Sequence, residues 1–316
     1  MAVTIRVRAI TKCQLRVRAR LPGKDSREVK NAPVPPARRI MTRRRTMTRL
    51  GLIPIAGLLA TAAPVQAQAV TVARAAATTA GAAHSGRVSS LCGRYQHFAV
   101  ATAEGAHFVV KNDNYGGQRE CLAVRGERPN FTVTRSQLPT WHAKPQAYPF
   151  ILRGCSWGTC SAPDSDLPKQ VSALRRPVAT WRTTQVPKGE WDAAFDTWFG
   201  THPMTTGQAD GAEMMIWLNA RHIKVPPRTR ILRIDHVRWY LLHWRACQTG
   251  TCWNYIQFRR VWPALRVRQL RLLPFIHRAQ QRGWIQPAWW LENIEAGFEL
   301  WQGGTGLGTD WFWARA

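Results

Sequence analysis

Short runs in which apolar and polar residues alternate, separated by Gly, Pro and Asn, make up most of the sequence after residue 91. A period of two places successive side chains on opposite faces of an extended chain, so these runs predict β-strands with one buried face. We expect one helix over residues 273–283, with Pro274 near its start and Gly283 at its end. We expect strands over 97–110, 147–153, 178–184, 191–199, 212–219, 239–245, 253–260 and 294–301. Many short strands and a single helix predict an all-β sandwich or jelly roll.

The N-terminal region has the pattern of an export signal. Four arginines at 43–45 and 49 precede an apolar run over 50–63, and Ala67-Gln68-Ala69 forms an A-x-A cleavage site. The apolar run is too short for a permanent membrane anchor. We therefore expect a signal peptide over 41–69, a linker rich in Ala, Thr and Gly over 70–90, one folded domain over 91–316, and a secreted, extracellular protein. Residues 1–40 are interpreted as sequence upstream of a true start at Met41 or Met47; the alternative is a genuine long leader.

Six cysteines follow the leader, and an even number in an exported chain predicts disulfides. Cys155 with Cys160, and Cys247 with Cys252, each bound a short Gly-bearing loop, so local pairing is natural and leaves Cys92 with Cys121. Cys13 is expected to be unpaired. A zinc site is disfavoured because no Cys or His cluster has ligand spacing.

The formal net charge of +27 at first suggests a nucleic-acid-binding protein. Its distribution changes that interpretation: residues 1–69 hold fifteen Lys/Arg and two Asp/Glu, and residues 221–282 hold fourteen basic residues and one acid, Asp235. The second stretch is most simply a solvated basic face; attraction to acidic cell-wall polymers or nucleic acid is the functional alternative. Export and disulfides disfavour nucleic acid as a partner, and we expect a monomer.

Three expected strands each place a carboxylate two residues from a Trp on the face that does not enter the core. In 212–219, Glu213, Met215 and Trp217 share this face, opposite the apolar residues at 212, 214, 216 and 218. In the other two strands the pattern is repeated by Asp196 with Trp198, and by Glu295 and Glu299 with Trp301. Any single strand of this kind could be an ordinary half-exposed strand. Three together predict a cleft.

Glycoside hydrolysis needs this combination, because two carboxyl groups flank the bond that is cleaved while aromatic faces stack on the sugar. A separation of about 5–5.5 Å between the carboxyls gives retention of anomeric configuration, and about 6.5–9.5 Å gives inversion. For Glu213 and Glu299 we expect about 5–6 Å.

The segments resemble glycoside hydrolase family 12, whose members are retaining endo-β-1,4-glucanases and xyloglucanases with a β-jelly-roll fold and a concave cleft. The resemblance covers residues 91–313. Glu213 lies in E-M-M-I-W, where the family has E-x-M-I-W, and Glu299 lies in A-G-F-E-L-W, where it has A-G-F-E-x-W. The F-D-T-W segment at 195–198 matches the strand whose Asp bonds the nucleophile. The resemblance therefore implies Glu213 as nucleophile, Glu299 as general acid/base, and Asp196 orienting Glu213 by a hydrogen bond.

The same resemblance implies the substrate contacts. N-D-N-Y-G at 112–116 matches the family's N-N-x-W-G, so Tyr115 replaces a Trp platform at the distal end of the cleft. Substrate-binding roles are expected for the following residues: Asn112, Tyr115, Trp198, Met215, Trp217, Glu295 and Trp301. Bacterial members also have the Cys92–Cys121 and Cys155–Cys160 disulfides, but the family does not supply Cys247–Cys252.

The sequence thus predicts a secreted endo-acting hydrolase of β-1,4-glucan, which could be cellulose, mixed-linkage glucan or xyloglucan. No metal or cofactor is expected, and the nine histidines lack triad or H-E-x-x-H spacing. The alternative is a non-catalytic polysaccharide-binding jelly roll, which would need the aromatic residues but not two facing carboxyls. Residues 41–69 leave no expected membrane anchor in the mature chain.

Overall fold

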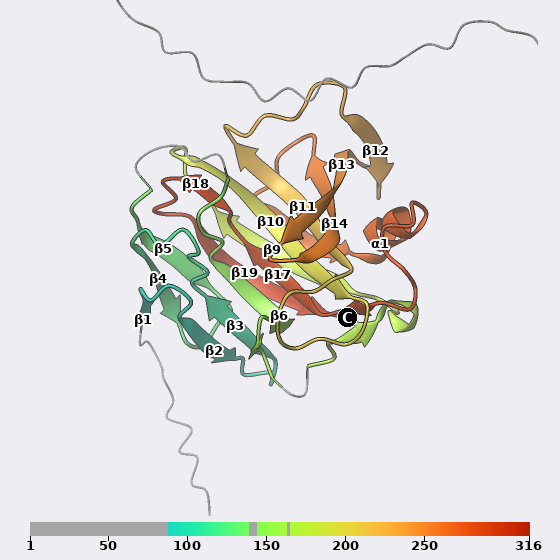
Figure 1. Ribbon diagram of the computed structural model, residues 1–316. Helices are drawn as coiled ribbons and strands as arrows, with labels where there is room; N and C mark the ends of the chain where they lie inside the picture. The colour runs from blue at the N-terminus through green and yellow to red at the C-terminus, as the bar shows by residue number, and fades with distance from the viewer. Residues whose placement is uncertain (1–87, 139–143, 163–164) are drawn as a thin grey trace, which may run out of the picture. The chain divides into compact units, whose positions relative to one another are not determined.

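The computed structural model describes residues 88–138, 144–162 and 165–316, which form two β-sheets and one α-helix (Figure 1). The predicted leader over 1–40, the signal peptide over 41–69 and most of the predicted linker lie outside the described residues. Among the described helices, none is long and apolar enough to cross a membrane. The all-β jelly-roll prediction is confirmed by the two sheets and by the solved structures compared below.

The smaller sheet has the strand order β1-β4-β5-β19-β9-β15. Its strands are as follows: β1 (Val88–Leu91), β4 (Glu120–Arg125), β5 (Phe131–Ser136), β19 (Gly308–Arg315), β9 (Val178–Thr184) and β15 (Arg266–Arg271). The pairs within this sheet are antiparallel.

The larger sheet has the order β12-β13-β14-β11-β10-β17-β6-β3-β2, and β11 and β14 in it run parallel. Its main strands are β12 (Arg230–Ile234), β13 (Val237–Gln248), β14 (Thr251–Arg260), β11 (Ala212–Arg221), β10 (Glu190–Gly200), β17 (Asn293–Gly297), β6 (Phe150–Ser156), β3 (His107–Lys111) and β2 (His97–Ala101). Short strands β7 (Thr159–Cys160), β8 (Lys169–Gln170), β16 (Trp290–Leu291) and β18 (Leu300–Gln302) pair at its margins.

The inner faces of the two sheets meet in one hydrophobic core. Trp181 of β9 packs edge-on against Phe195 of β10, with 5.3 Å between ring centroids, and both side chains are fully buried. Helix α1 (Leu273–Gln280) closes the core beside β13 and β14, where Phe275 contacts Trp239 and Phe258 (Figure 1). The inner face of each sheet therefore packs in the core, and the outer face of the larger sheet is left for functional side chains.

Four sequence predictions need correction. Residues 97–110 form a hairpin of β2 and β3 instead of one strand, because the chain turns at Gly105, whose φ is +80°. Residues 294–301 divide into β17 and β18 with a break at 298–299. Residues 88–90 were placed in the linker, but they form β1, which pairs with β4 next to the Cys92–Cys121 disulfide. The predicted helix ends three residues earlier, at Gln280.

The structure contains the three predicted disulfides, Cys92–Cys121, Cys155–Cys160 and Cys247–Cys252. The last two each join directly opposed residues of a hairpin, β6 with β7 and β13 with β14. The local-loop argument was sufficient for these pairs because both loops are hairpin turns.

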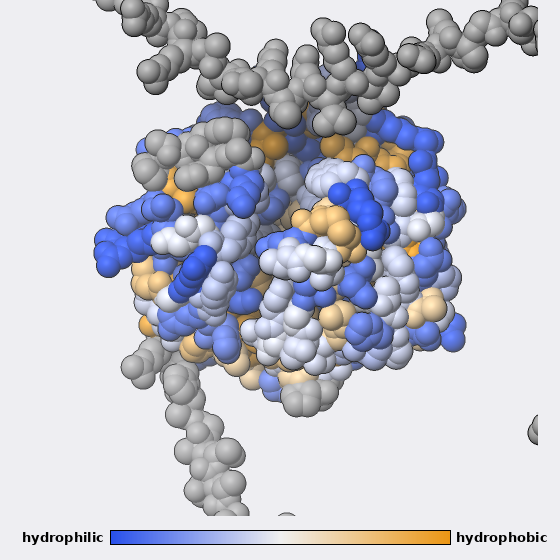
Figure 2. Space-filling view, viewed as in Figure 1, coloured by the Kyte–Doolittle hydropathy of each residue, from blue (hydrophilic) through white to orange (hydrophobic). Residues whose placement is uncertain are grey.

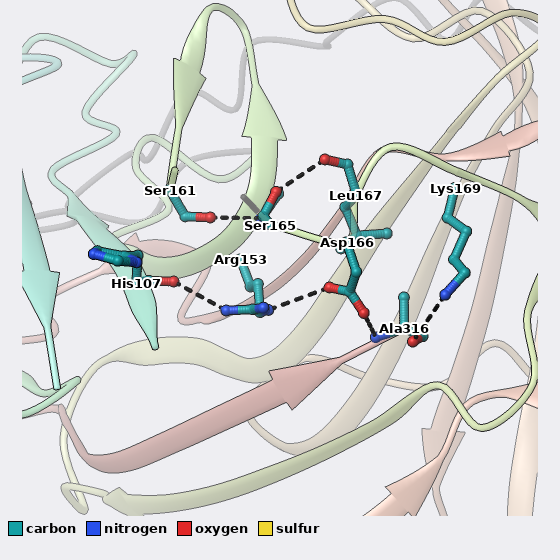
Figure 3. Close-up of polar contacts among 9 residues, drawn as sticks. His107, Arg153, Ser161, Ser165, Asp166, Leu167, Lys169 and Ala316 are labelled. Atoms are coloured by element: carbon teal, nitrogen blue, oxygen red, sulfur yellow. Dashed lines mark hydrogen bonds and ion pairs between the residues drawn. The ribbon is translucent and has the colours of Figure 1, made fainter. Parts of the chain in front are cut away.

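Polar contacts tie the end of β19 to the segment after β7 (Figure 3). The Ala316 backbone N–H donates to Asp166 Oδ2 at 2.9 Å, and Lys169 Nζ donates to the Ala316 carbonyl at 3.3 Å. Arg153 of β6 completes the group, with its Nε 3.4 Å from Asp166 Oδ1. These contacts hold the C-terminal end of β19, an inner strand of the smaller sheet, against β6 of the larger one.

Candidate active site

Strands β10, β11 and β17 lie side by side at the middle of the larger sheet, and their non-core faces gather carboxylates and aromatic rings. The expected alternation in β11 is present: Met214 and Ile216 enter the core, while Met215 and Trp217 form a separate cluster with Ala194 and Trp301. Cross-strand register places Asp196 opposite Met215 on one side and opposite Glu295 on the other. Figure 2 shows that this view of the molecule is hollowed between the part that carries β3 and β6 and the part that carries β13 and β14.

Glu213, the predicted nucleophile, is held by a tryptophan. Its side chain is 9% exposed, and its Oε2 accepts a 2.7 Å hydrogen bond from Trp253 Nε1 on the parallel strand β14. Trp253 is itself buried against Trp198, with 5.6 Å between ring centroids. A hydrogen bond to a charged acceptor is among the stronger ones in proteins, so Trp253 both orients Glu213 and favours its ionised form.

Asp196 differs from its prediction. Its Oδ2 accepts a 3.0 Å hydrogen bond from Trp198 Nε1, and its Oδ1 is buried without a hydrogen-bond partner among the described residues. Among the described residues the structure shows no hydrogen bond from Asp196 to Glu213; each carboxyl instead accepts one from a tryptophan, Trp198 or Trp253. Glu213 acts on Asp196 through charge: burial, and then the charges of Glu213 and Glu299, raise the pKa of Asp196 well above its usual value.

Glu299 lies in the break between β17 and β18, and it is partly exposed. Its backbone carbonyl accepts a 3.1 Å hydrogen bond from the Asp192 N–H on β10, which brings the two side chains together. Asp192 is 0% exposed, and neither of its carboxylate oxygens has a donor among the described residues. Two adjacent carboxyls without another donor can bond each other only through a proton that one of them keeps.

The pKa values of this pair are consistent with a shared proton. Burial, followed by the charge and hydrogen bond of Asp192, raises the pKa of Glu299 well above its usual value. Burial raises the pKa of Asp192 to about 8, while its bond with Glu299 and the charge of Arg259 oppose the rise. Asp192 therefore ionises first, and Glu299 keeps the proton.

The other pair of neighbouring carboxyls is Glu213 with Asp196. Burial raises the pKa of Glu213 to about 8, opposed by the Trp253 hydrogen bond and increased further by the charges of Glu299 and Glu295. Burial, and then the charges of Glu213 and Glu299, raise the pKa of Asp196 well above its usual value. Carboxyls whose environments separate their pKa values are suited to different roles, one as a proton donor and one as an anion. Here the Trp253 hydrogen bond favours the ionised form of Glu213, and the hydrogen bond with Asp192 favours the protonated form of Glu299.

Aromatic side chains line the site around these carboxyls. Trp217 and Trp301 contact edge to face, with 6.1 Å between centroids, and Arg259 lies 5.7 Å from the Trp217 ring. Met215 Sδ accepts a 2.9 Å hydrogen bond from the Tyr255 hydroxyl, so Met215 is fixed two residues from Glu213 on β11. At the other end Trp157, which is 47% exposed, packs edge-on against Trp198 at 5.1 Å. Flat rings with their edges fixed in this way offer faces for sugar stacking.

Two predicted substrate contacts are corrected by the structure. Asn112 is 0% exposed, and its amide donates to the Gly93 carbonyl at 3.0 Å, so it holds a loop instead of facing a ligand. Glu295 is 2% exposed and lies beside Asp196 on the neighbouring strand β17, where burial raises its pKa well above the usual range. Tyr115 is half-buried against Tyr148 and its neighbours, and burial, with the Glu299 charge next, raises the pKa of its phenol. It stays a candidate platform.

Asp192, Trp253 and Tyr255 were missed by the sequence reasoning. Asp192 lies four residues before Asp196 in the same strand. The period of two therefore places both side chains on the face opposite the core, and this was the signal available in the sequence. Trp253 and Tyr255 reach the site because β14 runs parallel to β11, with Glu213 opposite Tyr255. No sequence pattern indicated that pairing. Within the described residues, no group of three or more His, Cys, Asp or Glu side chains is arranged to hold a metal ion.

Comparison with known proteins gives a consistent result. The model of glycosyl hydrolase family 12 matches residues 106–314. The crystal structure of a metagenome-derived glycoside hydrolase family 12 endoglucanase is 36% identical, with a TM-score of 0.65, covering 72% of this chain and 97% of that one. Endoglucanase Cel12A from Rhodothermus marinus is 36% identical, with a TM-score of 0.65, covering 72% of this chain and 98% of its own. A probable cellulase, Cel12b of Mycobacterium tuberculosis, is 25% identical over 151 residues, which is 48% of this chain and 97% of the relative.

Proposed function

The chain belongs to glycosyl hydrolase family 12, and from that premise we propose that it cleaves internal β-1,4 bonds of glucan with retention of anomeric configuration. The observation that carries the proposal is the division of the carboxyls into two pairs, Glu213 with Asp196 and Glu299 with Asp192. In the second pair the shared hydrogen bond raises the pKa of Glu299, and in the first the Trp253 hydrogen bond favours the ionised form of Glu213. A binding module needs rings for stacking, but it has no use for a second buried carboxyl pair that holds a proton.

In the first step, a Glu213 carboxylate oxygen attacks the anomeric carbon and the bond from that carbon to the leaving oxygen breaks. Glu299 gives its proton to the leaving oxygen, so the departing chain leaves as a neutral alcohol. The product is a glycosyl ester on Glu213. Trp253 supports this step by holding Glu213 through the 2.7 Å hydrogen bond, which fixes which oxygen stays free to attack.

In the second step, Glu299 is a carboxylate and takes a proton from water while that water attacks the anomeric carbon. The ester bond breaks, Glu213 returns to its anionic form, and Glu299 regains its proton. Asp192 is the positioning residue for this cycle. Its charge raises the proton affinity of Glu299, so that Glu299 is protonated again before the next substrate binds.

Trp217 and Trp301 are the proposed stacking surfaces next to the reacting bond, with Tyr115 as a platform further along the cleft. The family-12 relatives named as endoglucanases support cellulose or mixed-linkage glucan as the substrate. Reducing-sugar release and viscosity should be followed on carboxymethyl cellulose, mixed-linkage β-glucan and xyloglucan side by side. An endo-acting enzyme lowers viscosity faster than it releases reducing ends. No cleavage of any of the three polymers would refute the proposal.

The two carboxyl roles are separated by azide rescue. The Glu299→Gln variant keeps the nucleophile, so an aryl cellobioside with an acidic phenol should still form the ester and then stall. Azide needs no base and should restore turnover with a β-glycosyl azide as product. The Glu213→Gln variant should give the α-azide by direct displacement. The opposite pair of products would exchange the two roles.

Secretion is the remaining part of the proposal. It is supported by the signal-like pattern over 41–69 and by three disulfides, which persist mainly in oxidising compartments. Expressed with its leader in a bacterial host, the protein should accumulate in the culture medium with an N-terminus after Ala69. Retention of the full chain in the cytoplasm, with free thiols, would contradict this part without affecting the catalytic proposal.

A further inference from the structure

A cavity of about 500 Å³ opens on the outer face of the smaller sheet. Its lining includes the outward-facing Arg182 of β9 and Trp311 of β19. Trp181 also borders the cavity, but its side chain and that of Phe312 are buried in the core. The catalytic carboxyls lie on the non-core face of the other sheet. The cavity and the active site are therefore on opposite sides of the sandwich, and the proposed hydrolysis does not use the cavity.

Two β-bulges shape this cavity. The register shifts between Thr309 and Trp311 on β19, and between Val267 and Leu270 on β15, so bulges flank β9 on both sides. Bulges bend a strand and redirect its side chains, which hollows an otherwise flat sheet face. At the second bulge Gln269 has φ +50°, and its N–H donates to Thr180 Oγ1 at 3.1 Å. The shape of the cavity is thus set by the backbone as well as by side-chain positions.

Four arginines surround the cavity: Arg128, Arg182, Arg266 and Arg268. The one acid in the lining, Asp310, lies 3.5 Å from Arg182 Nε. Within the described part of the chain, no carboxylate forms a salt bridge with the other three. The cavity therefore carries unneutralised positive charge around a half-exposed tryptophan, Trp311.

We propose that this cavity binds a carboxylated sugar, a uronate residue of an acidic polysaccharide. A cavity of about 500 Å³ lies in the usual range of small-ligand sites, roughly 300–1,000 Å³. The Trp311 ring offers a face for the C–H surface of a pyranose, and the arginines offer paired N–H donors for its carboxylate. A nucleic acid would instead favour a continuous basic groove that follows a phosphate backbone, whereas here the charge surrounds a single hollow.

The proposal assigns a role to part of the basic stretch over 221–282, because Arg266 and Arg268 belong to it. An enzyme that binds an acidic polymer through this cavity would keep its active-site cleft close to uncharged glucan in the same material. Binding on the outer face and cleavage in the cleft are then independent properties.

The test is binding of an oligogalacturonate by isothermal titration, with its methyl-esterified form as a neutral probe of the same backbone and a single-stranded oligonucleotide as a phosphate probe. Arg266→Gln with Arg268→Gln should weaken binding by about tenfold or more, since losing one charge-assisted hydrogen bond accounts for about tenfold. Separately, Trp311→Ala should weaken it by about tenfold through the loss of the stacking surface. Arg233→Gln with Arg238→Gln is the matched control. It removes the same charge from exposed positions of the same basic stretch, outside the cavity.

The expected result is binding of the oligogalacturonate, no binding of the ester, and loss only in the cavity variants, with unchanged unfolding temperatures and glucan cleavage. An equal loss in the control variant would show non-specific attraction and overturn the proposal. Tighter binding of the oligonucleotide at the same residues would assign the cavity to phosphodiesters instead. No binding of the oligogalacturonate at low salt would also overturn it. Should Trp311→Ala fail to fold, the arginine variants alone decide the outcome.

Discussion

The hydrogen bond from Trp253 to Glu213 allows a quantitative test of how the nucleophile is kept ionised. In Trp253→Phe an aromatic ring still packs beside Trp198, but the indole N–H that donates to Glu213 Oε2 at 2.7 Å is gone. A hydrogen bond to a charged group contributes about 1.5–3 kcal/mol, and one pKa unit corresponds to about 1.4 kcal/mol. The pKa of Glu213 should therefore rise by about one to two units.

The sign of the effect on activity follows from the role of Glu213. Because the nucleophile must be ionised, the acidic limb of the kcat/KM profile reports its pKa in the free enzyme. The variant should move this limb upward, with a loss of about ten- to a hundredfold on the acidic side and a much smaller loss near the optimum. The assay is initial-rate hydrolysis of an aryl cellobioside across a pH series in constant ionic strength.

Trp262→Phe is the matched control, since the Trp262 side chain is 72% exposed. Its profile should coincide with that of the unmodified protein. If Trp253→Phe lowers kcat/KM by the same factor at every pH, Trp253 only packs against its neighbours, and the account of how Glu213 stays ionised is wrong.

Three further predictions concern Asp192, Tyr115 and Glu120. Asp192→Asn removes the charge that raises the pKa of Glu299, so the basic limb of kcat/KM should move to lower pH, and an unchanged basic limb would exclude Asp192 as the positioning residue. Tyr115→Ala should raise KM on long glucans while the shortest cleaved substrate changes little, and Tyr115→Trp should restore it; equal effects on both substrates would assign Tyr115 to packing. Burial raises the pKa of Glu120 to about 8 from 4.5, so its contribution to stability is present below about pH 4.5 and lost as pH rises through about 8. The unfolding temperature should therefore be higher at pH 5 than at pH 8, and Glu120→Gln should reduce that difference; a protein more stable at pH 8 would contradict the burial of these carboxyls.

The alternation in β11 was enough to predict which side chains enter the core and which face the site. Each residue of a strand is constrained by the one two positions away, so Glu213, Met215 and Trp217 could be assigned to one face without coordinates. The same held for the hairpin disulfides, because their loops are short. The turn within 97–110 could also have been recognised, since Glu104-Gly105 interrupts the apolar run.

Contacts between strands that are distant in the chain could not be predicted. Trp253 reaches Glu213 only because β14 lies parallel to β11, and Asp192 reaches Glu299 only because the chain breaks between β17 and β18. Alternation specifies a face but not a neighbour. The family motif likewise predicted that Asn112 lies near the cleft, whereas its side-chain amide donates hydrogen bonds to backbone carbonyls. A buried hydrogen-bonding role and a ligand contact have the same sequence signature.

The central claim is that Glu213 becomes covalently bonded to the sugar. The most direct measurement is mass spectrometry of peptic peptides after inactivation with a 2-deoxy-2-fluoro cellobioside that carries a good leaving group. The fluorine slows both steps and the leaving group speeds the first, so the glycosyl ester accumulates. The account predicts one added fluorocellobiosyl group, on the peptide that contains Glu213. A label on the peptide with Glu299 or Asp196, or inactivation with no covalent label, would contradict it.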